Sequence, residues 1–589
     1  MKKSRQMEKE FKILKQQLGQ IEEIAAYTRV SQLWSHEAAV RKKLKVLKQM
    51  EGKGIKGFDA IYEGYRTLLD NLSQRILEDY NEKNKKAYKL SEIIAENPEE
   101  YLNSGILTVL MKVHIPKKIA HAFEIHFPAN PKDEYTLARG MKRKVYLHLG
   151  DTNTGKTYHA IKRLMEADSG IYLAPLRILA LEIYERLNDE GVKCNLLTGE
   201  EEMLVEGARH ISSTVEKLNI DKHYEVAVID EIQMIGDSQR GAAWTRALLG
   251  LQCKELHICG AKNAQDLLLR ILEDCQDVID VKTYMRNVPL EVEEQYFDLK
   301  GAMAGDALIT FSKKRVLELA KRYKDRGIKT SIIYGDLPPE VRRLQYQEFI
   351  TRENELLVST DAIGMGVNLP IRRIVFMDIK KFDGDEVRYL TSQEVKQIAG
   401  RAGRKGIYEV GYVNAAGGKA GFIKESISCE DEPIGEAVLG PSEALLAIEE
   451  LPLKEKLALW ATREEKIPLY RKMDVRDYLI ILDRIKKYKL SESVQWKLMK
   501  LPFDVGNEVL CDTFLEFVSE YFIRKSATLT KPVEGERTLE NLETYYQKIN
   551  LYYSFSKNFG LEFDEEWVYA EREKISEKIN QLLVNIKIN

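Results

Sequence analysis

Two series of short apolar runs alternate with helical patterns in the middle of the chain. The first series comprises residues 145–149, 171–173, 226–229 and 256–258, and the second comprises 307–311, 331–334, 356–359 and 373–377. Continuous apolar runs of this length are typical of strands that are buried on both faces of a parallel sheet. Because the runs alternate with helices, they predict βαβ units and two successive parallel-sheet domains.

Helical spacing dominates both ends of the chain. One helix face on the N-terminal side is marked by Ile61, Tyr65, Leu68, Leu69, Leu72 and Ile76. The pattern therefore predicts an α/β protein in which all-helical regions flank the two sheet domains. We expect a helical N-terminal region at 1–140, sheet domains at 141–290 and 291–425, and a helical C-terminal domain at 426–589.

Composition and charge leave the class of ligand open. The net charge is −2, whereas a dedicated nucleic-acid binder is usually basic. No apolar stretch reaches the length of a membrane span, so we expect no membrane partner. The basic start of the chain is followed at once by Glu8 and Glu10, which argues against a secretory signal and a presequence. We therefore expect a cytoplasmic protein with reduced cysteines.

A glycine-rich loop follows the first apolar run directly. It consists of Gly150, Asp151, Thr152, Asn153, Thr154, Gly155, Lys156 and Thr157, and a helical pattern comes after it. Strand, glycine loop and helix in this order are the signature of a phosphate-binding P-loop. Its backbone N–H groups and helix N-terminus face the phosphates, Lys156 neutralises them, and the Thr157 hydroxyl binds Mg²⁺. The loop predicts a nucleoside-triphosphate site, with a Gly-rich turn that binds nothing as the alternative.

A carboxylate pair ends the apolar run 226–229. Asp230 comes directly after this run, where it can orient Mg²⁺ together with Thr157. Glu231 is then the natural group to polarise an attacking water. Gln233 completes an Asp-Glu-Ile-Gln box. A solvated helix start is the alternative, and the P-loop upstream argues against it.

Two arginines stand three residues apart in the second series. Residues 397–404 read Gln-Ile-Ala-Gly-Arg-Ala-Gly-Arg. On a helix, Arg401 and Arg404 would lie on successive turns of one face and reach the same polyphosphate. Arginine suits this role because its fork spreads positive charge over phosphate oxygens in the transition state. A basic helix on a wet surface is the alternative.

These segments carry a resemblance to a known family. Residues 230–233 and 397–404 resemble motifs II and VI of the superfamily-two DExH-type helicases. Other motifs of that series are resembled by 174–177 (Ia), 212–214 (Ib), 258–260 (III), 309–312 (IV) and 359–366 (V). The P-loop, the Asp-Glu-Ile-Gln box and the stretch 240–246 are similar in particular to the suppressor-of-var helicases, known from the mitochondrial RNA degradosome. Residues 502–522 resemble the helical C-terminal region of that family.

The resemblance implies two RecA-like domains with one nucleotide in the cleft between them. The catalytic residues it implies are Lys156, Asp230, Glu231, Gln233, Gln397, Arg401 and Arg404. Two glycines of motif V, Gly364 and Gly366, join the P-loop in the nucleotide site. Contacts with the nucleic-acid backbone, which position a strand without reading it, are assigned to Pro175, Arg177, Ser213, Thr214, Ser312 and Thr360. Helix capping is the alternative for each Ser and Thr.

The function that the resemblance implies is an ATP-dependent 3′-to-5′ RNA helicase that uses Mg²⁺ and acts in RNA turnover. Its expected partners are RNA and, as a further candidate, an exoribonuclease. A DNA or mixed-substrate helicase and a nucleotide-gated RNA clamp without unwinding are the alternatives. The adenine-reading glutamine of DEAD-box relatives is missing, because no glutamine lies between Gln74 and Gln233. Other nucleoside triphosphates are therefore candidate cofactors beside ATP.

A hairpin signal lies between motifs V and VI. Asp383-Gly384 is flanked by potentially extended segments, and both turn positions favour residues that tolerate positive φ. Related helicases place a β-hairpin at this point, where it can act as a wedge at the duplex junction. An ordinary surface turn is the alternative.

Overall fold

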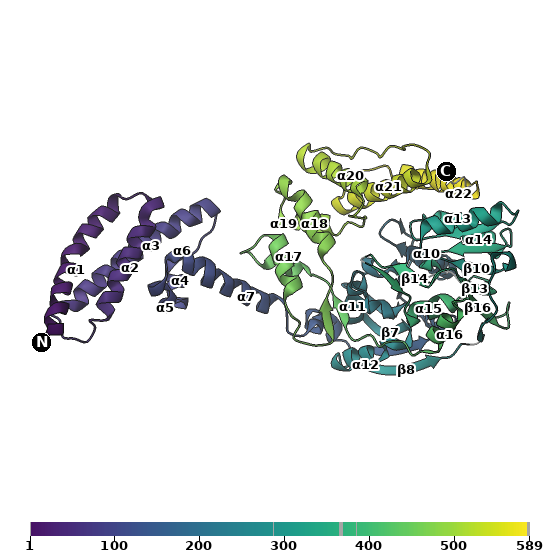
Figure 1. Cartoon of the computed structure of the whole chain (residues 1–589), viewed down its shortest axis with the longest axis horizontal. Coiled ribbons are helices and arrows are strands. Elements are labelled where there is room, and N and C mark those ends of the chain that lie inside the picture. Colours follow the sequence, from purple (N-terminus) through teal and green to yellow (C-terminus); the bar gives the residue numbers. More distant parts are fainter. Residues whose placement is uncertain (1, 287, 365–368, 385, 586–589) are drawn as a thin grey trace. The chain divides into compact units, whose positions relative to one another are not determined.

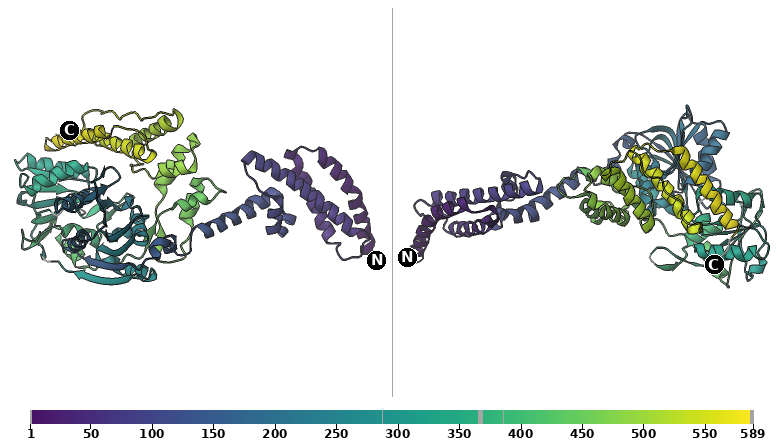
Figure 2. Two further views of the ribbon diagram at one scale, coloured as in Figure 1. Left: turned by 180° about the vertical axis from the view of Figure 1, so that it is seen from behind. Right: turned by 90° about the horizontal axis from the view of Figure 1, so that it is seen from above.

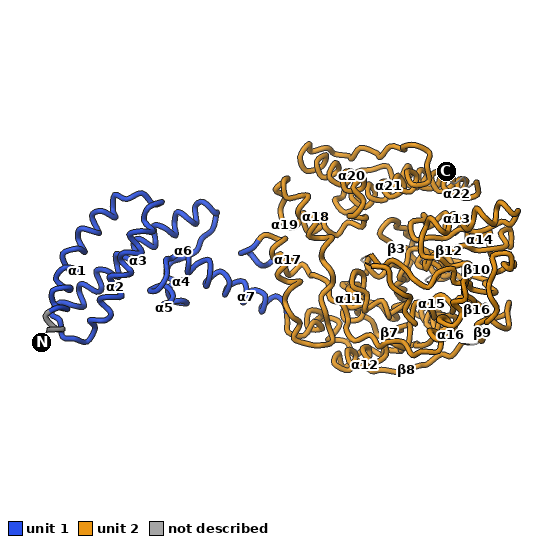
Figure 3. Tube along the Cα trace, viewed as in Figure 1, with its two compact units in different colours: residues 1–127, 447–451 blue, residues 128–446, 452–589 orange. Residues whose placement is uncertain are grey.

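The computed structural model describes residues 2–286, 288–364, 369–384 and 386–585. They form two compact units, coloured separately in Figure 3: residues 1–127 with 447–451, and residues 128–446 with 452–589. The second unit contains two large sheets whose strands pair mainly parallel, and two pairs of short strands. The predicted fold class, two RecA-like sheet domains with helical regions before and after them, is thus confirmed. The four domain boundaries stay a prediction.

The first unit is helical. Its main helices are α1 (Lys2–Tyr27), α2 (Leu33–Lys48) and α3 (Phe58–Asn84), which pack side by side (Figures 1 and 2). Shorter helices follow: α4 (Leu90–Glu96), α5 (Pro98–Asn103), α6 (Ile106–Val109) and α7 (Ile115–His126). The predicted apolar face of α3 is buried from Tyr65 to Ile76. Buried Glu37 accepts hydrogen bonds from Arg41 and Ser73, which compensate its charge.

The first sheet has the strand order β4-β3-β5-β2-β6-β7-β1-β8. Its strands are β1 (Lys144–Gly150), β2 (Gly170–Ala174), β3 (Cys194–Leu197), β4 (Glu202–Met203), β5 (His210–Thr214), β6 (His223–Ile229), β7 (Gln252–Gly260) and β8 (Val278–Tyr284). β3 and β4 pair antiparallel, and the other neighbours pair parallel. Because parallel strands end at one edge of a sheet, the P-loop after β1 and Asp230 after β6 meet there.

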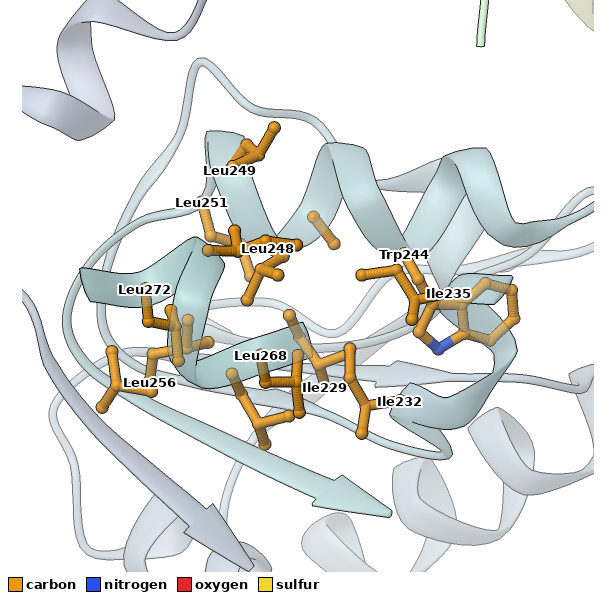
Figure 4. Packing of buried hydrophobic residues seen from close by; sticks show 14 of the residues in the cluster. Ile229, Ile232, Ile235, Trp244, Leu248, Leu249, Leu251, Leu256, Leu268 and Leu272 are labelled. Atoms are coloured by element: carbon orange, nitrogen blue, oxygen red, sulfur yellow. The ribbon is translucent and has the colours of Figure 1, made fainter. Parts of the chain in front are cut away.

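Helices cover both faces of the first sheet. α9 (Lys156–Met165) and α10 (Arg177–Asp189) share one hydrophobic cluster with Tyr172 and Val228. α11 (Gly241–Gly250) and α12 (Gln265–Asp274) pack on the opposite face. Figure 4 shows this second cluster, in which Trp244 of α11 packs beside Ile232 and Ile235, just after the carboxylate pair. The turn that carries Asp230 and Glu231 is thus held in place by the buried apolar side chains that follow it.

The second sheet repeats the parallel construction without a P-loop. Its order is β11-β12-β10-β13-β16-β9, with parallel pairing of all these neighbours. The strands are β9 (Leu290–Val292), β10 (Asp306–Ile309), β11 (Thr330–Ile333), β12 (Leu356–Ser359), β13 (Arg373–Phe376) and β16 (Gly411–Ala415). The helices are α13 (Lys313–Lys324), α14 (Pro339–Ile350), α15 (Ser392–Ala399) and α16 (Ala420–Ser428). The ends of β10 and β12 place Ser312 and Thr360 at one edge.

The predicted hairpin is confirmed. β14 (Lys380–Phe382) and β15 (Val387–Tyr389) pair antiparallel, with Lys380 opposite Tyr389, while Asp385 lies outside the described residues. The C-terminal part contains α17 (Leu453–Thr462), α18 (Arg476–Ile485), α19 (Glu492–Met499), α20 (Glu508–Val518), α21 (Leu539–Phe559) and α22 (Glu565–Val584). α21 and α22, yellow in Figures 1 and 2, lie side by side. The pattern did not predict the parallel strand pair β17 (Ala437–Leu439) and β18 (Tyr470–Lys472).

Candidate functional site

Two side chains of the glycine loop bind backbone carbonyls of the same loop. The Lys156 ammonium donates to the carbonyl oxygens of Gly150 and Asp151 at 3.2 and 3.0 Å, and the Thr154 hydroxyl donates to that of Asp151 at 3.0 Å. A Cβ atom at Gly150 would lie 2.4 Å from the carbonyl oxygen of Tyr284, so only glycine permits this approach to β8. Lys156 is thereby held inside the loop, next to the N–H groups that face a phosphate.

Asp230 is fixed from four directions. Its carboxylate accepts from Thr157 Oγ1 at 3.3 Å, from Tyr172 Oη at 2.8 Å and from its neighbour's N–H at 2.9 Å, and its carbonyl oxygen accepts from Trp244 Nε1 at 2.9 Å. Burial, and next the charge of Glu231, raise the pKa of Asp230 to about 6. The raised pKa means that the surroundings of the Asp230 carboxylate supply too little positive charge to stabilise its ionised form. A divalent cation beside Thr157 and Asp230 therefore fits the site.

Glu231 adopts a strained backbone conformation. Its φ is +50°, in the left-handed region that non-glycine residues rarely occupy. The Gln233 amide donates a short hydrogen bond to the Glu231 carboxylate, and the Gln233 carbonyl accepts from Ala261 N at 3.1 Å. The Asp-Glu-Ile-Gln box is therefore tied to the end of β7, which carries motif III. Strain of this kind is concentrated at functional sites.

Motif VI lies directly against the glycine loop. The Asn153 amide donates to the carbonyl oxygen of Gly403 at 3.1 Å. A Cβ atom at Gly400 would lie 1.6 Å from Thr152 Oγ1, so this contact requires glycine. The predicted helical placement of the arginine pair is wrong, because α15 ends at Ala399 and Gly403 has a φ of +77°. The two arginines therefore follow the end of α15, on a turn that packs against the loop.

Motif V supports this turn. The guanidinium of Arg401 donates to the carbonyl oxygen of Gly364 at 3.0 Å through Nε. The Gln397 side chain lies within 3.5 Å of the position that a Cβ atom at Gly364 would take. Arg404 follows on the same turn, with Glu182 of α10 near enough for both arginines to lower the pKa of its carboxyl, which burial raises overall. Gly366 lies outside the described residues.

The hydroxyl residues assigned to a nucleic-acid strand are not gathered into one open surface. Ser213 is only 1% exposed, and its hydroxyl donates to the carbonyl oxygen of Thr214. Thr360 is buried and caps a short helix by accepting from Ala362 N at 3.3 Å, as in the capping alternative. Thr214 and Pro175 are also buried. Ser312 is exposed at the N-terminus of α13.

Arg177 belongs to an ion-pair network. Its guanidinium contacts Glu200 at 2.7 Å, Glu201 at 3.0 Å and Glu340 of α14 at 3.0 Å, and it donates to the Tyr546 hydroxyl of α21 at 3.3 Å. The same arginine thus joins the first sheet domain, the second sheet domain and the C-terminal helices. Its expected contact with a phosphate would have to compete with three carboxylates.

Sequence reasoning missed Tyr172 and Arg286 and gave Trp244 no role at the site. Tyr172 and Trp244 hold Asp230, while Arg286, two residues beyond β8, donates to backbone carbonyls of the glycine loop and of motif VI. A polar Tyr within the apolar run 171–173 was an available signal for the first. Arg286 carries no signal of its own, because its partners are backbone atoms.

No cluster of three His, Cys, Asp or Glu side chains within the described ranges could hold a metal, and no described helix could span a membrane.

Family models match three segments of the chain. Residues 131–284 match the DEXQ-box helicase domain of Suv3, and residues 292–406 match the helicase conserved C-terminal domain. Residues 539–585, which contain α21 and α22, match the ATP-dependent RNA helicase SUV3 C-terminal domain. The matches cover the first sheet, most of the second sheet and the terminal helix pair, while β16 (Gly411–Ala415) lies beyond the second match.

Several curated proteins are similar over most of this chain. The mitochondrial DExH-box ATP-dependent RNA helicase DExH16 of Arabidopsis thaliana is 34% identical over 490 residues, which are 78% of this chain and 84% of the relative. DExH18 of the same plant is 34% identical over 77% of this chain and 60% of the relative. Human SUPV3L1 is 34% identical over 73% of this chain and 58% of the relative. The chain thus spans about 60% of the length of the longer relatives.

The expected cytoplasmic location is wrong, because these relatives are all named as mitochondrial. That expectation rested on Glu8 and Glu10, which the structure places on the solvent face of α1. Their charge therefore reflects an ordinary amphipathic helix and is no guide to the compartment. Motifs I, II, V and VI contact one another through Thr157 and Asp230, Asn153 and Gly403, and Arg401 and Gly364, and a relative is matched over 84% of its length. The chain belongs to the Suv3 family of DExH-box helicases.

Proposed function

We propose that the protein is an ATP-dependent RNA helicase that unwinds duplexes in the 3′-to-5′ direction. The observation that carries this proposal is the contact of Thr152 and Asn153 with Gly400 and Gly403, which joins the P-loop of one sheet to motif VI of the other. The activity and the RNA substrate are taken from the names of the relatives, and the polarity is taken from the family resemblance.

The cofactors of this proposal are ATP and Mg²⁺. Thr157 and Asp230 would hold the metal, and Lys156 with the loop N–H groups would hold the phosphates. The raised pKa of Asp230 supports a cation at this position, since positive charge would restore the ionised carboxylate. When bound, Mg²⁺ neutralises charge on the β- and γ-phosphates.

The hydrolytic roles fall to both sheet domains. Glu231, oriented by Gln233, would accept a proton from the attacking water. Arg401 and Arg404 would stabilise the charge of the transferred phosphoryl group, an effect that is typically worth about 10³–10⁵ in rate. Because the two halves of this centre belong to different sheet domains, hydrolysis would depend on the approach of the two domains. Nucleotide binding and hydrolysis would then move one domain relative to the other in each cycle.

The test is unwinding of partial duplexes that carry a 3′ or a 5′ overhang, in RNA and in DNA versions, with and without ATP. We expect ATP-dependent unwinding of the RNA duplex with a 3′ overhang. Unwinding of DNA alone would favour the DNA-helicase alternative, and RNA-stimulated ATPase without unwinding would favour the clamp. An exoribonuclease partner would be tested by copurification of the full chain with a purified 3′-to-5′ exoribonuclease.

A further inference from the structure

Arg286 lies at the crossing between the two sheets and contacts the glycine loop and motif VI. It lies two residues after β8 of the first sheet and four residues before β9 of the second. Its Nη1 donates to the carbonyl oxygen of Thr152 at 3.4 Å and to that of Gly400 at 2.7 Å. Its Nη2 donates to the carbonyl oxygen of Ala402, and its Nε to that of Val288 at 2.6 Å. One guanidinium therefore binds the glycine loop and motif VI together.

The charge of Arg286 has no carboxylate partner among the described residues, since every acceptor above is a backbone carbonyl. Arg143 shows the opposite situation. Burial acts to lower the pKa of Arg143, yet the hydrogen bonds and charge of Asp277 raise it overall. For Arg286, burial lowers the pKa to about 10, and only the nearby charge of Asp151 opposes this.

A half-buried guanidinium whose hydrogen bonds all go to neutral carbonyls, with only the charge of Asp151 near it, has its positive charge incompletely compensated. An anion placed against it gains both charge attraction and charge-assisted hydrogen bonds. The loop residue that Arg286 contacts, Thr152, belongs to the segment 150–157 that is built to hold a polyphosphate. A bound triphosphate would therefore bring negative charge to this guanidinium.

We propose that Arg286 is a third arginine of the nucleotide site, which binds the polyphosphate and fastens the glycine loop to the motif VI turn. This inference rests on the proposed function. The two parts of the role need different properties of the side chain. Attraction to phosphate needs positive charge, whereas spanning Thr152 and Gly400 needs the planar fork, which lysine does not have.

The experiment compares Arg286→Gln, Arg286→Lys and, as a matched control, Arg270→Gln, which removes an exposed arginine of α12. Equilibrium binding of a fluorescent ATP analogue with Mg²⁺ gives Kd, and RNA-stimulated ATP hydrolysis gives KM and kcat. We expect Arg286→Gln to raise Kd and KM about tenfold and to lower kcat, because hydrogen bonds to charged groups are typically worth that much. Arg286→Lys should keep Kd within about threefold of the parent and still lose kcat. Arg270→Gln should match the parent.

A folded Arg286→Gln variant with parental Kd, KM and kcat would overturn the proposal. Equal weakening of Kd by glutamine and lysine, with lower melting temperatures in both, would reduce Arg286 to a structural role and also overturn it. If the glutamine variant does not fold, parental kcat in the lysine variant would contradict the proposal that Arg286 fastens the glycine loop to the motif VI turn. Should the parent bind the analogue but hydrolyse no ATP with RNA, the proposed function fails, and the Kd values still decide on Arg286.

Discussion

The residues that the motifs assign to the nucleotide and those assigned to the strand backbone are treated differently by the fold. In the nucleotide set, partners converge across the chain: Thr157 contacts Asp230, and Asn153 contacts Gly403. In the strand set, the Ser213 and Thr360 hydroxyls form hydrogen bonds with backbone atoms of Thr214 and Ala362. Arg177 forms ion pairs with carboxylates.

This difference shows which binding sites are defined by consecutive residues and which depend on distant parts of the chain. A glycine loop carries its binding groups in its own backbone, so eight consecutive residues suffice to define it. A hydroxyl or an arginine on a rim binds a phosphate only if its neighbours leave it open. Those neighbours, such as Glu340 and Tyr546 beside Arg177, come from distant parts of the chain.

The largest effect is expected in the nucleotide set. Arg404→Ala should lower kcat for RNA-stimulated ATP hydrolysis by about 10³-fold, because an arginine finger stabilises the transition state. The Kd for an ATP analogue should change less than tenfold, since the P-loop is intact. Arg322→Ala, which removes an exposed arginine of α13, is the control and should keep parental turnover. Near-parental turnover of Arg404→Ala would mean that this arginine of motif VI takes no part in hydrolysis.

The second effect concerns the stability cost of Asp230. Its folded pKa of about 6 exceeds the ordinary value of 3.8, so stability present below pH 3.8 is lost as the pH rises through 6. The ionised carboxylate then costs roughly 3 kcal/mol at pH 7.5 and about 1 kcal/mol at pH 4.5. Asp230→Asn should therefore raise the melting temperature of the nucleotide-free protein by a few degrees at pH 7.5, and less at pH 4.5. Equal shifts at both pH values, or a similar shift in the exposed control Asp221→Asn, would contradict this origin.

A third effect separates unwinding from hydrolysis. The hairpin exposes Phe382 (62%) and Val387 (67%), whereas Lys381 and Arg388 form ion pairs with Glu394. A variant with Phe382→Ser and Val387→Ser keeps those ion pairs. It should slow unwinding about tenfold through the loss of stacking between Phe382 and the separating bases, since base–aromatic stacking is worth about 1–3 kcal/mol per base. RNA-stimulated ATPase should stay within about twofold. Met303→Ser, at another exposed apolar position, is the control, and parental unwinding by the hairpin variant would make this segment a simple connection.

The smallest effect concerns the base of the nucleotide. With no glutamine upstream of the P-loop to read adenine, GTP, UTP and CTP should support turnover within about tenfold of ATP, a window of roughly 1.4 kcal/mol. Competition of the four triphosphates under one set of conditions measures this. A hundredfold preference for ATP would mean that another residue reads the base.

The same division explains how much of the molecule could be predicted from sequence. Strands β1, β2, β6 and β7 were visible as apolar runs, and the meeting of Thr157 with Asp230 followed from the motifs at their ends. Strand β5 was missed because His210, Ser212 and Ser213 are polar yet buried. His210 and Ser212 bond the carbonyls of Leu164 and Ala180, far along the chain, and Ser213 bonds that of its neighbour Thr214. The arginine turn was misread as helix, because only the close packing of Thr152 on Gly400 shows that the helix must end.

The central claim is that both sheets contribute to one hydrolytic centre, and a double-mutant cycle tests it most directly. ATP turnover with RNA is measured for the parent, Glu231→Gln, Arg404→Ala and the double variant, with Glu231→Gln combined with Arg322→Ala as the control. Groups that act on one transition state are strongly non-additive. We expect the double variant to be hardly slower than the slower single variant. Losses that multiply would contradict a shared centre.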